Sequence, residues 1–234
     1  MATTRTKIIA CQVFVEELRS LLPGGVAMDT LEMSLHERPR SLRRLLQERI
    51  DASSGYDTIV LGYGMCGQAT VGLRATHSRL VLPRVDDCIG MFLGSRAAYK
   101  AQREREPGTY FLTKGWVGSG VTTPFSAYDA VRARWGRDRA DRLMDTMLKH
   151  YKRLAFVRTG PDDDELARAR ALARATARRF GLAYEEIEGD RGLVHGLLYG
   201  PWDERYIVVP AGGVVRMAEF FGGAARRPAA GRPG

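Results

Sequence analysis

Short apolar runs that alternate with helical segments constrain the fold of this chain more than any other feature. The runs are β-branched or aromatic, are bounded by turn residues and predict buried strands at residues 7–13, 26–33, 57–62, 79–83, 109–112, 154–158, 182–187 and 206–209. Apolar residues at helical spacing predict helices at residues 15–22, 39–50 and 163–180, and one or two helices around Gly136 within residues 125–151. Strands that alternate with helices indicate an α/β fold, namely a mostly parallel, Rossmann-like sheet with helices on both faces.

Length and composition bound the domain organisation. A chain of 234 residues, 44% of them hydrophobic, can bury the core of one α/β domain, which we expect over residues 1–223. Residues 153–213 have the pattern of a further βαβ unit, so a second lobe there is the alternative, although no linker marks a boundary. Residues 224–234, rich in Ala, Gly, Pro and Arg, are expected to form a disordered basic tail.

The distribution of charge and apolar residues narrows the choice of partners. No apolar run reaches the roughly 18 residues of a membrane span, and no export signal precedes the first run, so we expect a cytoplasmic protein without a membrane partner. The formal charge is +9, but arginines alternate with acidic residues in the predicted helices, and Arg226, Arg227 and Arg232 lie in the tail. This pattern does not favour a nucleic-acid partner and is compatible with a small anionic one.

The three cysteines of the chain each follow a different predicted strand. Cys11 lies near the end of 7–13, Cys66 follows 57–62 and Cys88 follows 79–83. The carboxyl ends of parallel strands meet at one edge of a sheet, where ligands bind. Three thiolates there could hold zinc, or a 4Fe-4S cluster with one iron left open, and helix N-termini after Cys66 and Cys88 would lower their thiol pKa values. The alternative is that each cysteine is a small buried apolar residue.

Several polar residues complete this candidate metal site. His36 stands before the helix at 39–50 and is a candidate fourth ligand or catalytic group, the alternative being a residue that caps that helix. Asp87 is a candidate general base or a hydrogen-bond acceptor that orients a ligand. The candidate contacts for an anionic substrate are Arg84, Ser95, Arg96 and Lys114.

A glycine motif supports a different hypothesis. Gly62, Gly64 and Gly67 form the pattern G-x-G-x-x-G after a predicted strand and before residues 68–73, which we expect to be helical. The acidic pair 86–87 stands about where the ribose ligand of a dinucleotide fingerprint is expected. We favour tight turns that bring the backbone of Gly64 and Gly67 close to the bound substrate and metal, and keep a nucleotide site as the alternative.

Seven segments give the chain a resemblance to a known family. They are Ile9-Ala10-Cys11, Leu35-His36 with Pro39, Leu61-Gly62-Tyr63-Gly64-Met65-Cys66-Gly67, Pro83-Arg84 with Asp87-Cys88, Leu93-Gly94-Ser95-Arg96 with Tyr99, Gly108-Thr109-Tyr110 with Gly115-Trp116, and Trp202-Asp203 with Val208-Val209-Pro210. In these segments the chain resembles the DUF1638 family, bacterial and archaeal proteins named for lacking a known function. Asp86 stands where the family often has histidine, which argues against Asp86 as a required ligand. The resemblance implies an α/β fold, a shared polar site with cysteines, and an association with corrinoid or methyl-transfer systems.

Three functional hypotheses follow. The first is a metal- or iron–sulfur-cluster-dependent protein that acts on a small anionic substrate through Cys11, Cys66 and Cys88; if it is an enzyme, lyase or transferase chemistry is expected. The second is a non-catalytic metal or corrinoid accessory protein, or chaperone, that serves a methyl-transfer partner protein. The third is a nucleotide-binding Rossmann-like enzyme that uses the glycine motif.

Overall fold

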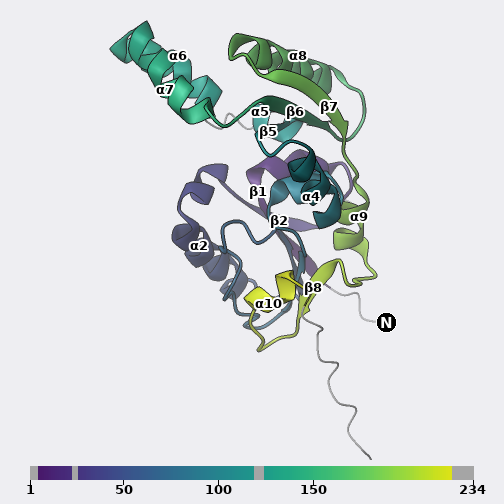
Figure 1. Cartoon of the computed structure of the whole chain (residues 1–234). Helices are drawn as coiled ribbons and strands as arrows, with labels where there is room; N and C mark the ends of the chain where they lie inside the picture. Colours follow the sequence, from purple (N-terminus) through teal and green to yellow (C-terminus); the bar gives the residue numbers. More distant parts are fainter. Residues whose placement is uncertain (1–4, 23–25, 119–123, 223–234) are drawn as a thin grey trace, which may run out of the picture.

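Two parallel-rich sheets form the framework of the molecule (Figure 1). The computed structural model describes residues 5–22, 26–118 and 124–222. The larger sheet has the strand order β2-β1-β3-β4-β8 and the smaller one the order β5-β6-β7. The α/β fold with mostly parallel strands, expected from the sequence, is confirmed, and it is distributed over two sheets rather than one.

In the larger sheet, four parallel strands are closed by one antiparallel strand. The strands are β1 (Thr6–Cys11), β2 (Ala27–Leu31), β3 (Thr58–Gly62), β4 (Arg79–Pro83) and β8 (Tyr206–Val209). β3 is buried along its whole length because β1 and β4 flank it and helices cover its faces, which explains its uninterrupted apolar sequence. β8 returns from the end of the chain and pairs with β4 in the antiparallel direction, with Leu80 opposite Val209.

In the smaller sheet, all three strands are parallel. They are β5 (Thr109–Thr113), β6 (Arg153–Arg158) and β7 (Ala183–Glu188). This sheet differs from the lobe suggested at residues 153–213, because it begins with β5 and does not contain β8. The apolar pattern of residues 206–209 identified a strand correctly, but period-two patterning does not indicate which strand will be the neighbour.

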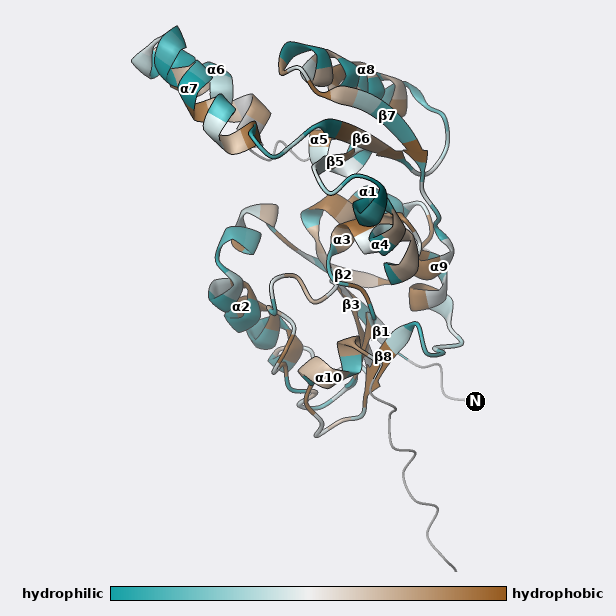
Figure 2. Ribbon diagram, viewed as in Figure 1, coloured by the Kyte–Doolittle hydropathy of each residue, from teal (hydrophilic) through white to brown (hydrophobic). Residues whose placement is uncertain are grey.

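The helices cover the sheets and turn their polar faces outward (Figure 2). Their bounds are α1 (Val15–Arg19), α2 (Pro39–Asp51), α3 (Cys88–Phe92), α4 (Arg96–Arg105), α5 (Lys114–Gly118), α6 (Pro124–Trp135), α7 (Arg137–Leu148), α8 (Asp164–Arg179), α9 (Gly192–Tyr199) and α10 (Met217–Phe220), with short 3-10 helices at Gln12–Phe14 and Met33–Glu37. In α2, Leu42, Leu46 and Ile50 recur every fourth residue and are buried, so one face of this helix packs on the core. The segment expected at 125–151 forms two helices, because Gly136 has a φ of 81° at the start of α7.

One continuous core joins the two sheets. The larger apolar cluster contains the buried residues of β1, β3 and β4, and it extends to Phe111, Ala155, Val157 and Ile187 of the smaller sheet. A second cluster lies between the smaller sheet and α6, α7 and α8, with Phe156 and Leu166 at its centre. One face of the smaller sheet therefore packs toward the first core, and the other face packs under helices. No helix within the described residues is long and apolar enough to cross a membrane.

The carboxyl ends of β1 and β5 approach each other closely at Gly115. This residue has no side chain, and its Cα lies against the carbonyl group of Val13, just after β1. The Phe14 and Phe92 rings stack nearby, with their centroids 4.2 Å apart. Gly115 thus allows the first turn of α5 to rest directly on the backbone of the other sheet.

We expect Gly115→Ala to lower the free energy of unfolding by about 1–3 kcal/mol, because its Cβ would overlap the Val13 carbonyl oxygen and force backbone movement. Gly55→Ala is the matched control, since a Cβ there meets no atom within 4 Å. Its effect should stay within about 0.5 kcal/mol. Urea unfolding of both variants measures the difference, and equal stabilities would contradict this account of the contact.

Candidate functional site

Backbone pairing brings two of the cysteine-bearing loops together. Cys11 is the last residue of β1, Cys66 follows β3, and Cys88 is the first residue of α3 after β4. The Met65 amide donates a hydrogen bond to the Val85 carbonyl oxygen at 2.9 Å, and the Cys66 amide donates one to the Asp86 carbonyl oxygen at 2.8 Å. These bonds extend the pairing of β3 with β4 beyond the strands.

The three thiols lie in the protein interior and influence one another electrostatically. Cys11 is 1% exposed and Cys66 is 6% exposed, while Cys88 is partly buried. Burial raises the pKa of Cys11 to about 11. Burial also raises the pKa values of Cys66 and Cys88, and the charges of Asp87 and of the neighbouring thiolates raise them further.

This result is opposite to the lowered thiol pKa values expected from helix N-termini. Residues 66–72 form turns, so no helix follows Cys66, and α3 after Cys88 has only five residues. The loss of hydration on burial therefore dominates, and the free thiols are held in their protonated form near neutral pH.

The thiols gather without forming a ready ligand set for a single ion. Within the described parts of the chain, no group of three or more His, Cys, Asp or Glu side chains is arranged so that it could hold a metal ion. The electrostatic influence of Cys11 and Cys66 on Cys88 nevertheless places all three side chains in one neighbourhood.

Cys66 occupies a strained backbone conformation. Cys66, Gly67 and Gln68 have φ angles of 47°, 62° and 68°, so three successive residues are left-handed. Only glycine adopts this region freely, and each of the other two costs about 1–3 kcal/mol. No residue pattern predicts this run, because Cys and Gln are not among the types that favour left-handed positions.

The glycine motif provides close packing rather than a phosphate-binding turn before a helix. A Cβ on Gly62 would lie 2.9 Å from the Cβ of Ala10, and one on Gly64 would lie 2.8 Å from the Val85 carbonyl oxygen. The helix expected at residues 68–73 is wrong, because the left-handed residues and Gly72, with a φ of 88°, turn the chain instead. Gly64 therefore brings two loops close together, while a dinucleotide fingerprint would need a helix at this point. The expected approach of the Gly64 and Gly67 backbone to a metal and substrate stays a prediction.

His36 has the hydrogen bonding of a histidine whose second nitrogen is available. Its Nδ1 lies 3.0 Å from the Met33 carbonyl oxygen, so Nδ1 carries the proton in the neutral ring and Nε2 keeps its lone pair. Burial lowers the pKa of His36, which favours this neutral form. The residue that precedes α2 is Arg38, so His36 does not cap that helix.

Tyr63 is a polar residue of this neighbourhood that the sequence analysis did not select. It is 1% exposed, its ring stacks on that of His36 with centroids 6.0 Å apart, and its hydroxyl group has no hydrogen-bond partner among the described residues. Burial, and then the nearby Cys11 and Cys66, raise the pKa of Tyr63. Leaving a buried hydroxyl group without a partner costs about 1–3 kcal/mol, so the Tyr63 hydroxyl needs a partner such as a water molecule or a bound ligand.

Asp87 caps α3 and lies near the thiols. Its Oδ1 accepts hydrogen bonds from the amides of Ile89 at 2.9 Å and Gly90 at 3.4 Å, and its Oδ2 accepts one from the Tyr99 hydroxyl at 3.0 Å. Burial raises the pKa of Asp87, although these hydrogen bonds oppose the shift. A partly buried carboxylate of this kind is a candidate proton acceptor. The capping of α3 alone would also explain why an aspartate stands at this position.

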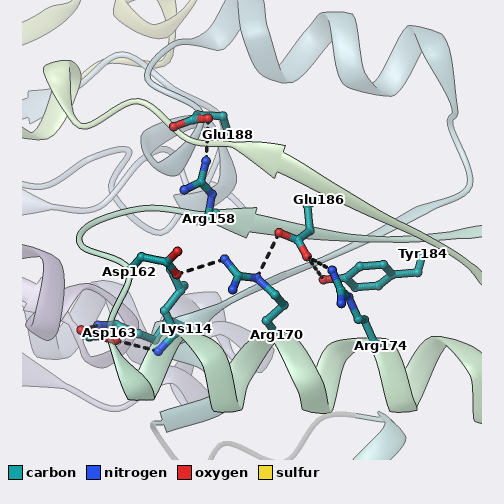
Figure 3. Close-up of polar contacts among 10 residues, drawn as sticks. Lys114, Arg158, Asp162, Asp163, Arg170, Arg174, Tyr184, Glu186 and Glu188 are labelled. Atoms are coloured by element: carbon teal, nitrogen blue, oxygen red, sulfur yellow. Dashed lines mark hydrogen bonds and ion pairs between the residues drawn. The ribbon is translucent and has the colours of Figure 1, made fainter.

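The predicted substrate contacts lie in two different pockets. Arg84, Ser95 and Arg96 line one of about 350 Å³. Lys114 lines another of about 660 Å³ between α1, α5 and α8. The Lys114 Nζ lies 3.2 Å from Asp163 and 3.5 Å from Glu165, so two carboxylates already neutralise its charge (Figure 3).

The polar network beside Lys114 belongs to the packing of α8 on the smaller sheet. Arg170 bridges Asp162 and Glu186, and Arg174 pairs with the same Glu186 carboxylate (Figure 3). These ion pairs join α8 to β7 across the surface. Lys114 continues the network to the start of α5, which gives it a structural position in addition to its place in the pocket.

Fold and site together define an α/β protein with cysteines at the carboxyl ends of three adjacent strands. The model of the family described as "Protein of unknown function (DUF1638)" matches residues 30–198. The chain belongs to this family, and the resemblance seen in the sequence is confirmed. No curated protein and no solved structure matches the chain.

We expect the glycine variant at position 68 to be more stable than the alanine variant. Gln68→Gly removes the cost of a left-handed side-chain residue, so it should exceed Gln68→Ala in unfolding free energy by about 1 kcal/mol. Lys100 lies exposed inside α4 and provides the control. There Lys100→Ala should exceed Lys100→Gly in unfolding free energy by about 1 kcal/mol, because alanine favours helices. Chemical denaturation measures all four variants, and the same order at both positions would contradict strain at Gln68.

We expect the thiols of the native, metal-free chain to react slowly with a thiol-specific disulfide reagent at pH 8. Burial raises the pKa values of the thiols above the usual range, so the fraction of reactive thiolate is small at pH 8. The reaction rate should increase with pH, and for Cys11 it should keep increasing until the pH approaches the pKa of about 11. The denatured chain is the internal control and should titrate three thiols promptly. Prompt reaction of all three in the native chain at pH 8 would contradict the raised pKa values.

Proposed function

We propose that Cys11, Cys66 and Cys88 hold an iron–sulfur cluster through which this cytoplasmic protein acts on a small anionic molecule. The observation that carries the proposal is the conformation of Cys66, whose buried thiol lies near two other thiols at a conformational cost. Backbone strain in a folded protein persists where the surroundings enforce it, and it concentrates at functional sites. A cysteine that served only to fill the core would not require a left-handed residue.

A cluster and a single zinc ion would use these thiols differently. Four ligands of zinc converge on one atom at about 2.0–2.3 Å, so an unoccupied zinc site usually resembles a compact group. The thiolates of a 4Fe-4S cluster bind different irons and therefore stand further apart. Three thiolates would leave one iron of a cluster open for substrate, and a zinc ion bound by the same thiolates is the alternative, which the metal content distinguishes.

His36 and Tyr63 supply the other groups that such a centre needs. The Nε2 of His36 is available because Nδ1 is bonded to the Met33 carbonyl oxygen, the arrangement that metal-binding histidines commonly have. His36 would be the fourth ligand, or its place would be left open for substrate. The unpartnered hydroxyl of Tyr63 could donate a hydrogen bond to the centre or to a molecule bound on it.

An open iron supplies Lewis-acid chemistry, which suits a lyase or a transferase acting on an oxygen-bearing anion. The chain's own contributions would be to exclude water, through the burial of Cys11, Cys66 and Tyr63, and to accept a proton at Asp87. The three thiols are protonated without metal, so binding would release protons and add to the stability of the folded chain.

One observation favours the second hypothesis, a metal or corrinoid accessory protein for a methyl-transfer partner. The α6–α7 hairpin projects from the smaller sheet (Figure 1) and carries exposed apolar side chains, Trp135 at 49%, Leu143 at 41% and Met147 at 44%. Such a patch is typical of protein–protein contacts. The number of turnovers per chain distinguishes the two hypotheses. An accessory protein transfers its metal centre or corrinoid once, whereas an enzyme converts many substrate molecules.

The deciding experiment compares two variants of adjacent residues, purified without oxygen. The wild type should contain iron and sulfide in cluster stoichiometry with visible charge-transfer absorbance, and Cys66→Ser should lose both. Met65→Leu is the matched control, because it removes a sulfur atom from the same loop without removing a thiol and conserves volume. Stoichiometric zinc in place of iron would show that the site holds zinc and not a cluster. Absence of metal from the wild type under reconstitution would contradict the proposal.

A further inference from the structure

The pocket lined by Arg84, Ser95 and Arg96 lies beside the N-terminus of α4 and has a strongly basic lining. It encloses about 350 Å³ between α4, α9, β8 and the end of α10. Arg84, Arg96 and Arg205 line it, and no acidic side chain is among its lining residues. Leu193, Phe220 and Phe221 supply an apolar wall. The pocket therefore combines positive charge with an apolar wall.

Two of the three arginines already have partners inside the protein. The Arg96 guanidinium lies 3.1 Å from the Asp86 carboxylate and donates a hydrogen bond to the Phe220 carbonyl oxygen at 2.7 Å. The Arg205 guanidinium binds both carboxylate oxygens of Asp203 at 2.8–3.0 Å. These pairs neutralise their charges and hold Arg96 and Arg205 in place as the sides of the pocket.

Arg84 is different, because its charge has no carboxylate partner among the described residues. Its Nη2 makes one long hydrogen bond, 3.4 Å, to the Tyr206 carbonyl oxygen. Its Nε is buried and has no hydrogen-bond partner in the part of the chain that the structure describes. A partly buried guanidinium with an unsatisfied donor and no counter-charge is unfavourable by itself, and an anion in the pocket would satisfy both needs.

The start of α4 provides further donors at the same place. Ser95 is the N-cap residue of this ten-residue helix, and its Oγ accepts the Ala98 amide at 3.0 Å. The amides of Arg96 and Ala97 come before the Ala98 amide in the first turn of α4, where helix geometry offers them no carbonyl partner. Free first-turn amides and the positive end of the helix dipole favour an anion.

We propose that this pocket binds a small molecule in which a carboxylate or phosphate group is attached to an apolar ring. The oxyanion would lie between the Arg84 guanidinium and the first turn of α4, and the ring would pack on Leu193, Phe220 and Phe221. This proposal does not depend on a metal centre, since none of these contacts involves a cysteine. Arg84 and Cys88 lie on the same loop after β4, so a bound ligand would touch the segment that positions Cys88.

The test is a calorimetric titration of the full chain with phenyl phosphate, benzoate and inorganic phosphate. We expect phenyl phosphate or benzoate to bind at least about tenfold more tightly than inorganic phosphate, because the ring gains apolar contact. The comparison of the first two probes identifies which oxyanion the site prefers. Arg84→Gln should weaken binding by about tenfold or more, because a charged hydrogen-bonding partner is lost.

Three further variants make the result decisive. Arg103→Gln, on α4 but outside this pocket, removes the same charge and should leave the affinity unchanged. Phe221→Ala, at a residue that is 56% exposed, should reduce the advantage of phenyl phosphate over inorganic phosphate without endangering the fold. Cys66→Ser should bind the probes as the wild type does.

Four outcomes would overturn the proposal. They are absence of binding of both ring probes at millimolar concentration, equal losses in Arg84→Gln and Arg103→Gln, inorganic phosphate binding as tightly as the tighter of the two ring probes, and loss of binding in Cys66→Ser. The second would show attraction to general surface charge, and the fourth would place the probes at the cysteines. Probe binding to a wild type that takes up no metal under reconstitution would contradict the cysteine proposal alone.

Discussion

The amide groups of Met65 and Cys66 bind the carbonyl groups of Val85 and Asp86, and this pairing fixes the geometry of the whole cysteine edge. It continues the β3–β4 ladder into two loops that would otherwise diverge as the strands twist apart. Gly64 makes the approach possible, because any side chain there would overlap the Val85 carbonyl oxygen. The same contact holds Cys66 in its strained conformation, with its thiol buried.

The second organising feature is the joint between the sheets. The carboxylate of Glu17, on α1, is buried; it accepts a hydrogen bond from the Thr159 hydroxyl and pairs with Arg191 at 3.2 Å. Thr159 follows β6 and Arg191 precedes α9, so one acidic side chain ties three segments together. A buried carboxylate is tolerated only with such partners, and removal of either would leave a costly unpaired group. The joint holds the carboxyl ends of the two sheets face to face.

Sequence patterns predicted the elements well and their assembly less well. The strands at 79–83 and 206–209 agree with β4 and β8 to the residue, because buried strands bounded by turns leave a clear signal. The sequence suggested a second βαβ unit at residues 153–213, but it did not predict that the smaller sheet contains β5 and lacks β8, since this depends on which strands become neighbours. The thiol pKa values were expected to fall, and they rise, because burial is a property of the assembled core and not of nearby helices. The orphaned hydroxyl of Tyr63 was likewise visible only once its neighbours were placed.

The α6–α7 hairpin has a consequence for how this family can diversify. A crossover between parallel strands requires a single helix, and the β5 to β6 connection contains α5 and the whole hairpin besides. The hairpin is held together internally by the Tyr128 hydroxyl bound to Asp141 and is tied to α8 by Arg179 and Asp129. None of these residues contributes to the cysteine edge. Insertions, deletions and changes of surface chemistry in this arm would leave β1, β3 and β4 undisturbed, so the arm could present a different recognition surface without a change in the framework.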